Sequence, residues 1–410
     1  MRPSVDAGVR TTGFLRPLSG RSSTVLVGMR WCLVLWLASR VMFFLVAAAV
    51  SAFPGTDHIP ASQWMFRVYS HQDSGHFFSI ATSGYFPADG SDPQHLRPAF
   101  FPGYPLLVRL LAWCTGGAHP SDLVWYAAMA MITWIAAYAA AVQLWVFAQE
   151  HTGRQLIANI AVVAFLFGPY SVFLMASYSE SLFLVFALGA WLAGLRHRWW
   201  LAGLLAAGAT LVRVNGLFLA AALLVMFILQ YRAADAENRR SHWASIAWLG
   251  LPGLSVIGYF GWLYSQTGHW NEWFLAQQTG WLRTTSWPWM ALGRSVSRFW
   301  HRPPQLDLIF QDVMELVAAA VLIAAVIWLF KRKAWPEFTY VGLTALSLLT
   351  SAYYLSIPRS LLTCFPLFVM FGHMTVTGRL PKSKLIVFVV LSALVLLIDT
   401  TSLLTHHWAG

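Results

Sequence analysis

Long apolar runs recur along this chain and constrain its fold more than any other feature. Hydrophobic residues make up 58% of the sequence and charged residues only 10%, whereas a soluble domain carries about 25% charged residues. A helix that crosses a bilayer needs about 20 apolar residues. The sequence therefore predicts an all-α polytopic membrane protein, a bundle of about eleven transmembrane helices. The predicted runs are 31–53, 122–148, 156–174, 179–195, 199–212, 214–230, 243–265, 313–330, 336–355, 359–377 and 383–404.

Basic residues between these runs orient the bundle. An alternating topology places 17 of the 27 Lys and Arg residues on the cytoplasmic side, as the positive-inside rule requires. It predicts a cytoplasmic basic N-terminal segment at 1–30, one transmembrane domain at 31–404 and an outward C-terminal tail at 405–410. The basic residues concerned are Arg2, Arg10, Arg16, Arg21, Arg30, Arg154, Arg196, Arg198, Arg232, Arg239, Arg240, Lys331, Arg332, Lys333, Arg379, Lys382 and Lys384.

This topology requires that residues 98–116 do not cross the membrane. Only ten residues separate Pro105 from Gly116, about half of what a crossing needs. We therefore expect a juxtamembrane or re-entrant helix there. If the segment does cross, the two short runs around Arg213 must instead fuse into one span.

Two long connections then face outward, at 54–121 and 266–312. Both are too long for ordinary loops and too rich in aromatic residues to be disordered, so we expect them to form juxtamembrane loop helices. The net charge of +11 follows the membrane topology and predicts no nucleic-acid partner. The three cysteines show no metal-ligand spacing and no disulfide framework.

Five polar clusters fall on the same outward side of this topology. Ionisable groups at membrane depth are costly and usually face a bundle interior or a wet cavity. For the helix-end charges the alternative is snorkelling to the interface, and for Asp73 it is a solvated loop acid. Convergence on one side favours a shared site. The clusters contain His71, Asp73 and His76; Tyr178 and Glu180; Arg213 and Asn215; Gln277; and Arg359.

One carboxylate among several arginines suits glycosyl transfer from a lipid-phosphate sugar. Arginine forks and helix N-termini bind phosphate. Glycoside hydrolysis needs two carboxyl groups because the leaving alkoxide must be protonated. A phosphate leaves without an acid, so a single base can deprotonate the acceptor hydroxyl while cations stabilise the departing charge. Direct displacement at the anomeric carbon would invert its configuration.

His71 and His76 flank Asp73 in a pattern that could be mistaken for metal ligands. Their spacing of five residues does not place them on one helical face, and no second acid cluster accompanies them. The sequence therefore predicts no metal and no cofactor. We expect both histidines to hydrogen-bond to the acceptor or to Asp73.

The motifs resemble those of the PIG-V family, the GPI mannosyltransferase II type with its bacterial relatives. The resemblance runs from the first apolar run to near residue 372. It implies a GT-C fold and transfer of mannose from a polyprenyl-phosphate donor, with Asp73 matching the acidic residue expected to be the catalytic base. The motifs lie at 73–77 (DSGHF), 99–106 (AFFPGYPL), 178–183 (YSESLF), 209–216 (ATLVRVNG), 264–268 (YSQTG), 358–359 (PR) and 365–368 (FPLF).

Two departures from the family pattern concern the acceptor. His71 and His76 stand where aromatic or other residues are common, so contacts with the acceptor are expected to differ. The basic, Trp-rich style of the chain suggests a bacterial relative in the plasma membrane. A bacterium without a GPI pathway must use another lipid or glycan acceptor.

The leading hypothesis is an inverting, extracytoplasmic mannosyltransferase. Arg213 and Arg359, with Arg97, would hold the donor phosphate, while Tyr178, Glu180 and Asn215 would position sugar or acceptor. The alternative is a transporter or flippase of a lipid-linked saccharide, since the broken pair at 199–230 resembles the broken helices of transporters. A non-catalytic scaffold for another membrane enzyme, and a partner subunit, also remain open.

Overall fold

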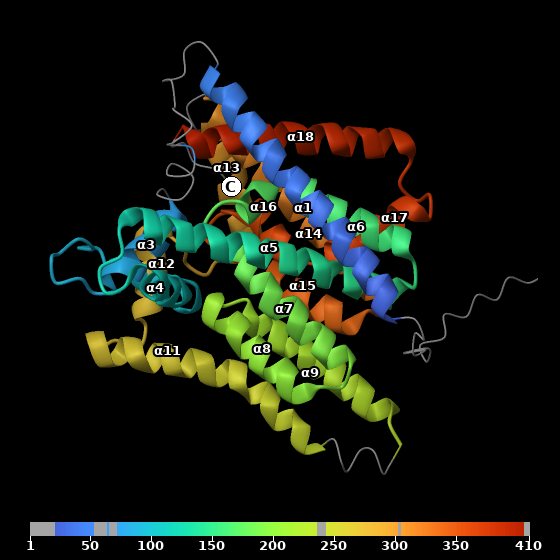
Figure 1. Cartoon of the computed structure of the whole chain (residues 1–410), viewed down its shortest axis with the longest axis horizontal. Coiled ribbons are helices and arrows are strands. Elements are labelled where there is room, and N and C mark those ends of the chain that lie inside the picture. The colour runs from blue at the N-terminus through green and yellow to red at the C-terminus, as the bar shows by residue number, and fades with distance from the viewer. Residues whose placement is uncertain (1–20, 53–63, 65–71, 236–242, 302–304, 406–410) are drawn as a thin grey trace, which may run out of the picture.

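The computed structural model describes residues 21–52, 64, 72–235, 243–301 and 305–405, and within them the protein is helical without a strand (Figure 1). His71 lies outside these residues. The helices are α1 (Arg21–Ala52), α3 (Asp73–Ser83), α4 (Gly103–Gly116), α5 (Asp122–Thr152), α6 (Gln155–Phe167), α7 (Glu180–Leu195), α8 (Trp199–Val212), α9 (Gly216–Ala233), α11 (Leu251–Thr267), α12 (Glu272–Trp281), α13 (Pro288–His301), α14 (Leu306–Lys331), α15 (Trp335–Leu349), α16 (Ile357–Ser360), α17 (Pro366–Val376) and α18 (Lys382–Leu404), with 3-10 helices η1 (Arg97–Ala99), η2 (Ser171–Leu174), η3 (Trp243–Gly250) and η4 (Leu361–Thr363).

Six described helices are long and apolar enough to cross a membrane, which makes this a multi-pass membrane protein. A seventh span results if the helices on either side of an 83° bend, Ile357–Thr363 and Pro366–Val376, count as one. Every predicted apolar run overlaps a helix, but two of the runs are broken and several helices are shorter than a span, so the count of about eleven stays a prediction. The six are Thr24–Ala52, Asp122–Thr152, Gly216–Ala233, Trp243–Thr267, Leu308–Lys331 and Lys382–Leu404.

The short helix α7 is the centre of the core. It packs against α5 and α8, and most of its residues are buried. The face of α5 in the core carries alanines that are fully buried, including Ala137, Ala140 and Ala141. Small side chains let helix backbones approach closely in a membrane protein, where packing rather than water drives association.

The apolar run predicted at 156–174 is not one helix. Helix α6 ends at Phe167, and the chain continues as η2 after Tyr170, which has a positive φ of 65°. Gly168 and Pro169 explain this break, because proline disfavours helical geometry in the residue before it. The turn that follows brings the segment before α7 to the site described below.

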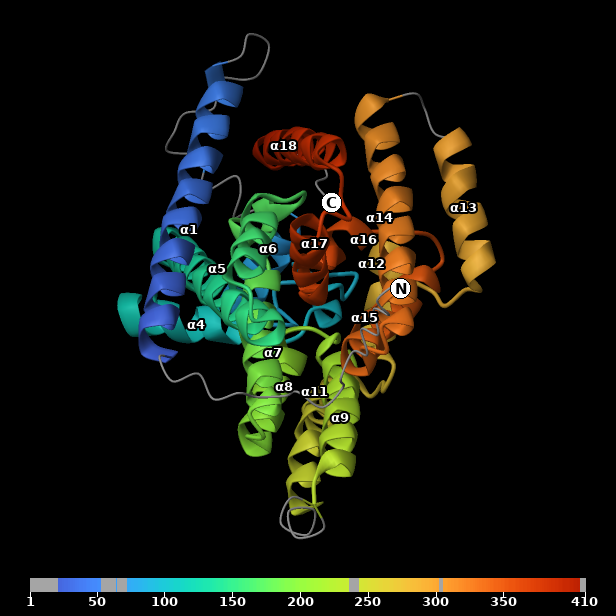
Figure 2. The ribbon, with the colours of Figure 1, turned by 90° about the vertical axis from the view of Figure 1, so that its right-hand side faces the viewer.

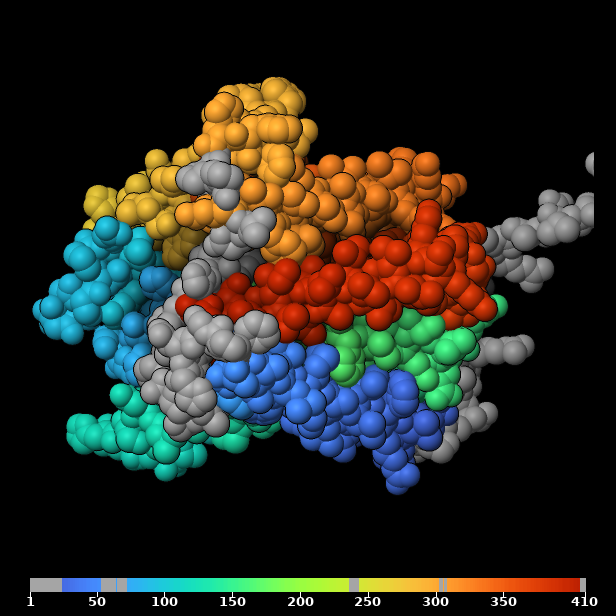
Figure 3. Space-filling model, turned by 90° about the horizontal axis from the view of Figure 1, so that it is seen from above, coloured from blue at the N-terminus to red at the C-terminus, as the bar shows by residue number. Residues whose placement is uncertain are grey.

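Helices α8 and α9 form a hairpin and are not fused into one span. They pack on one another across the turn at Arg213. Gly216 is required at this turn, since a Cβ there would lie 2.4 Å from the backbone of Thr210. In Figures 1 and 2, α8, α9 and α11 form the lower part of the bundle. Viewed from above, α18 lies between α1 and α14 (Figure 3).

The two long connections at 54–121 and 266–312 contain the helices expected of them. The first carries α3 and α4, the second α12 and α13. Helix α4 has 14 residues, a length of about 21 Å at 1.5 Å per residue, which is too short to cross the hydrocarbon core. In Figure 1, α3, α4 and α12 lie at one end of the bundle, and the turn between α17 and α18 lies at the opposite end.

A glycine in α8 tests how tightly the bundle is packed. A Cβ on Gly203 would lie 2.2 Å from the carbonyl oxygen of Trp248 in η3, and backbone cannot move aside as a side chain can. We expect Gly203→Ala to cost about 1–3 kcal/mol of stability, measured as a lower unfolding temperature in detergent. Gly258→Ala on α11 is the matched control, because it meets nothing within 4 Å. Equal unfolding temperatures for the two variants would contradict this packing.

Candidate active site

A cavity of about 320 Å³ opens at the end of the bundle where α3 and α12 lie. This volume is in the range of small-molecule sites. Its walls combine aromatic rings, among them Phe100, Trp273 and Trp281, with a small set of polar groups. The charged and amide side chains in the wall are Asp73, Arg213, Asn215, Gln277, Arg283 and Arg359.

Asp73 is the first residue of α3 and points into this cavity wall with 8% of its surface exposed. A carboxylate is stabilised at a helix N-terminus by the unpaired backbone N–H groups and the helix dipole. The helix start is fixed by Gln72, whose φ of 56° turns the chain sharply. Ser74 anchors it further by donating to the carbonyl oxygen of Ser177 at 3.2 Å.

Arg359 comes from the four-residue helix α16, which Ser356 opens in a left-handed conformation. The Glu315 carboxylate on α14 accepts hydrogen bonds from the backbone N–H groups of Ser356 and Ile357 and so holds the start of α16. Arg359 then bridges two acids. Its Nη1 lies 2.7 Å from Asp73 Oδ2, and its Nε lies 3.2 Å from Glu180 Oε1.

Glu180 continues this chain of charges to the α8–α9 hairpin. It is the first residue of α7 and fully buried. Arg213 Nη1 donates to its Oε1 at 2.7 Å and to Ser179 Oγ at 2.9 Å. Asp73, Arg359, Glu180 and Arg213 therefore form one continuous line of ion pairs, in which each buried charge is compensated by an opposite one.

The structure separates residues that face the cavity from residues that lie behind it. Asp73, Arg213, Asn215, Gln277 and Arg359 line the cavity, as expected of substrate-binding groups. The amide of Gln277 also donates to the carbonyl oxygen of Ala99 at 3.2 Å, which ties α12 to η1.

Glu180 and Tyr178 lie behind the cavity wall. Neither is among the lining residues, so direct contact with sugar or acceptor is not what their geometry favours. The Tyr178 hydroxyl donates to Gln72 Oε1 at 2.9 Å, and its ring lies 5.1 Å from the Arg359 guanidinium. Burial raises the pKa of Tyr178 well above its ordinary value. Both residues hold Arg359 in place.

His76 lies beside the cavity, where its ring stacks on Phe100 at 4.9 Å and meets the edge of Trp281 at 5.8 Å. Burial lowers the pKa of His76, partly offset by the negative charge of Asp73. The ring is therefore neutral at pH 7. No group of three or more His, Cys, Asp or Glu side chains that could hold a metal ion occurs among the described residues.

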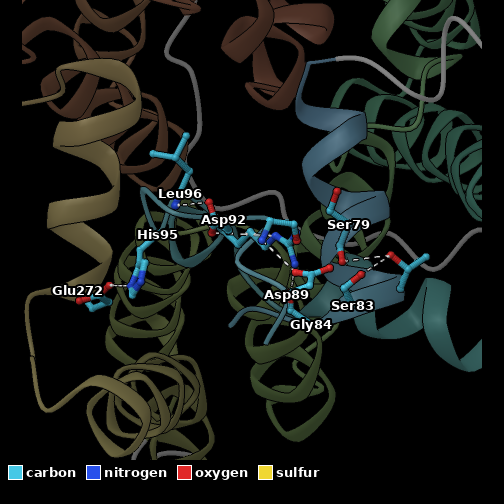
Figure 4. A network of polar contacts seen from close by, with 11 residues as sticks. Ser79, Ser83, Gly84, Asp89, Asp92, His95, Leu96 and Glu272 are labelled. Carbon is cyan, nitrogen blue, oxygen red and sulfur yellow. Dashed lines mark hydrogen bonds and ion pairs between the residues drawn. The ribbon is translucent and has the colours of Figure 1, made fainter. Parts of the chain in front are cut away.

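Arg97 is not brought to the cavity. Its guanidinium donates to the carbonyl oxygen of Gly84 at 2.7 Å and to Ser91 Oγ at 2.8 Å, which closes the loop between α3 and η1. Figure 4 shows this loop network, in which Asp92 accepts from the backbone N–H of Leu96 and His95 contacts Glu272 of α12. The geometry thus gives Arg97 a structural role and does not support the predicted contact with the donor phosphate.

Sequence reasoning missed Arg283, which lines the cavity from the connection between α12 and α13. The long segment 266–312 contains four arginines, Arg283, Arg294, Arg298 and Arg302, and no periodicity in the sequence singles out Arg283. The only signal was its position two residues after Trp281, at the end of an aromatic helix.

Comparison with known proteins supports the resemblance noted in the sequence. The family described as Mannosyltransferase (PIG-V) matches residues 23–266, which is more than half of the chain. Asp73, Glu180 and Arg213 lie within this range, and Arg359 lies beyond it. GPI alpha-1,6-mannosyltransferase 2 of Cricetulus griseus is 34% identical over 151 residues, which cover 36% of this chain and 29% of that protein. The match thus spans less than a third of the relative's length.

Among solved structures, the archaeal oligosaccharyltransferase AglB from Archaeoglobus fulgidus, in complex with an inhibitory peptide and a dolichol-phosphate, aligns with 92% of this chain and 56% of its own. The sequence identity is 13% and the TM-score 0.40, so the two folds are only loosely alike. Family membership rests instead on the match over residues 23–266. The chain is a multi-pass membrane protein that belongs to the PIG-V mannosyltransferase family.

Proposed function

We propose that the protein is an inverting mannosyltransferase of the GT-C type. It would transfer mannose from a polyprenyl-phosphate-mannose donor to a lipid or glycan acceptor on the extracytoplasmic side of the membrane. The observation that carries the proposal is the composition of the cavity wall. Of the described residues that line the cavity, Asp73 is the one carboxylate, and it is accompanied by three arginines.

This wall fits a reaction with one base and an anionic leaving group. The acceptor hydroxyl gives its proton to Asp73 while its oxygen forms a bond to the anomeric carbon. The bond from that carbon to the phosphate oxygen breaks, and its electron pair leaves with polyprenyl phosphate. Arginine side chains stabilise the charge on the departing phosphate. Attack opposite the leaving group inverts the anomeric centre.

The ion pair between Asp73 and Arg359 places a cation 2.7 Å from the proposed base. A donor phosphate that enters the cavity competes with Asp73 for Arg359, because both are anions. Part of the Arg359 pairing then shifts from Asp73 to the phosphate, which leaves the carboxylate free to meet the acceptor hydroxyl.

The buried position of Glu180 fits a positioning residue. It pairs with both Arg213 and Arg359 but does not face the cavity. Its negative charge holds the two guanidinium groups side by side against their mutual repulsion, so that both reach the cavity wall.

The extracytoplasmic location of the site is supported by the charge distribution. Basic residues concentrate in the connections α5–α6, α7–α8, α14–α15 and α17–α18. The turn between α17 and α18 lies at the end of the bundle opposite to α3 and α12 (Figure 1). The positive-inside rule favours a cytoplasmic position for the basic end, which supports an extracytoplasmic cavity.

The role of Asp73 is tested by Asp73→Asn, which keeps the shape of the side chain and removes the base. We expect the rate of mannose transfer from labelled polyprenyl-phosphate-mannose to fall about 10²–10⁴-fold, measured in proteoliposomes. Asp89→Asn is the matched control, because Asp89 is exposed and bonds to nearby Ser91. Transfer at the wild-type rate by Asp73→Asn would remove Asp73 as the base. Translocation of the donor without consumption would favour the flippase.

The positioning role of Glu180 predicts a large effect on stability. Glu180→Gln leaves two arginines without their shared carboxylate, and breaking a buried ion pair costs about 3–5 kcal/mol. Glu150→Gln is the control, since Glu150 pairs with Arg196 at the same distance of 2.7 Å but at a partly exposed site, where a pair contributes about 0–1 kcal/mol. Unfolding curves in detergent measure both. Similar small losses in the two variants would show that the Glu180 pairs are weak.

The accessibility of a native cysteine tests on which side of the membrane the cavity lies. Cys114 at the end of α4 is exposed at the cavity end, whereas Cys32 and Cys364 are buried. We expect a membrane-impermeant maleimide to label the protein on intact cells or spheroplasts, and Cys114→Ser to abolish that labelling. Arg332→Cys, introduced into the Cys114→Ser background, should be labelled only after permeabilisation. Labelling of Arg332→Cys on intact cells, with Cys114 labelled only after permeabilisation, would indicate a cytoplasmic cavity.

A further inference from the structure

Three guanidinium groups line the cavity, and two of them are already paired with carboxylates. Arg359 bridges Asp73 and Glu180, and Arg213 pairs with Glu180. The third, Arg283, has no carboxylate within ion-pair distance among the residues that the structure describes. Two negative and three positive charges leave this cluster with one unneutralised positive charge, and it belongs to Arg283.

The backbone around Arg283 holds the side chain against the cavity. Helix α12 ends at Leu282 in a left-handed conformation, and the N–H of Arg283 donates to the carbonyl oxygen of Gln277 at 3.3 Å. The chain then pairs with the segment after α15 through an antiparallel bridge between Thr285 and Ser351. A hydrogen bond of 2.7 Å from the N–H of Ser286 to Thr350 closes this crossing. Backbone hydrogen bonds on both sides of Arg283 therefore hold the loop that carries it.

The charged groups around Arg283 favour the binding of an anion. Burial lowers the pKa of Arg283, and the neighbouring positive charges of Arg359 and Arg213 lower it further, against the opposite influence of Asp73 and Glu315. The guanidinium nevertheless stays charged at pH 7, because arginine does not deprotonate in proteins. A bound anion would relieve the repulsion among these cations.

The same part of the wall offers hydroxyl donors. Thr284 and Ser351 line the cavity with Arg283. A phosphate oxygen accepts hydrogen bonds from hydroxyl groups and takes two parallel ones from a guanidinium fork. The apolar lining includes Phe274, whose ring is 57% exposed at the rim of the cavity. An apolar chain attached to such a phosphate could leave along this side.

We propose that Arg283, together with the hydroxyl groups of Thr284 and Ser351, binds the phosphate of the lipid-phosphate donor. This inference rests on the proposed function and assigns its donor site to a residue outside the Asp73–Arg213 ion-pair chain. Arg359 and Arg213 then face the reacting carbon and the departing oxygen, while Arg283 retains the phosphate before and after transfer.

The experiment measures binding of a polyprenyl phosphate without sugar to the purified full chain in nanodiscs. Wild type is expected to bind it, and Asp73→Asn at least as tightly, because the carboxylate that competes with the phosphate for Arg359 is removed. Arg283→Gln should weaken binding at least about tenfold, and Arg283→Lys should recover part of it, since lysine keeps the charge without the fork. Arg294→Gln is the matched control, because Arg294 lies on the neighbouring helix α13 and does not line the cavity. In turnover, Arg283→Gln should raise KM for the donor far more than it lowers kcat.

Two competitors identify the recognised group. The matching polyprenyl alcohol tests whether the lipid chain alone suffices, and inorganic phosphate tests whether the anion alone does. We expect the alcohol to bind at least about tenfold more weakly than the phosphate, with a difference that Arg283→Gln abolishes. Competition by millimolar inorganic phosphate that is equal in wild type and Arg283→Gln would assign the anion to another site.

The outcomes separate this inference from the proposed function. Wild-type affinity of Arg283→Gln for polyprenyl phosphate overturns the role of Arg283 and leaves the transferase proposal intact. Failure of the wild type to bind any polyprenyl phosphate overturns the proposed donor itself. If Arg283→Gln unfolds at a lower temperature than wild type, the binding measured for Arg283→Lys decides whether the charge is recognised. A folded Arg283→Lys variant that binds polyprenyl phosphate no better than Arg283→Gln would contradict recognition by charge.

Discussion

The site depends on the guanidinium of Arg359, which forms ion pairs with two carboxylates, Asp73 and Glu180. Glu180 also forms an ion pair with Arg213. The four residues come from α3, α7, the α8–α9 turn and α16, so these ion pairs tie together segments that are far apart in the sequence. A buried charge without a partner would be too costly in this interior. The charges therefore fix the relative positions of the segments that carry them.

The two acids, Asp73 and Glu180, have different positions relative to the cavity and therefore different roles. Asp73 faces the cavity, where an acceptor hydroxyl could meet it, while Glu180 lies behind the wall and holds two arginines. A site with two exposed carboxylates would resemble that of a glycoside hydrolase. One exposed carboxylate surrounded by cations suits instead a substrate whose leaving group is already an anion. The Glu315 carboxylate on α14 accepts hydrogen bonds from two backbone N–H groups at the start of α16, so the position of Arg359 depends on α14 as well.

The sequence predicted the parts of this structure that depend on composition and order along the chain. Apolar runs identified the long helices of the bundle, and polar clusters between them identified Asp73, Arg213 and Arg359 as candidate site residues. It could not predict where an apolar run bends, as after Phe167, because a buried short helix and a spanning helix have the same hydropathy. It also could not separate Arg97, which closes a loop, from Arg283, which turns into the cavity. Both are arginines in the long connections between apolar runs, and only tertiary contacts distinguish them. His71 lies outside the described residues, and its role at the acceptor stays a prediction.

A structure with a bound donor analogue tests the central claim most directly. A cryo-electron microscopy map of the full chain with a non-transferable polyprenyl-phosphate sugar would locate the phosphate relative to the ion-pair chain. The account predicts that the phosphate lies in the cavity within hydrogen-bond distance of Arg283, with the anomeric carbon turned toward Asp73 and Arg359 shared between acid and phosphate. A phosphate bound outside this cavity, with the Asp73–Arg359 pair remote from the sugar, would contradict it.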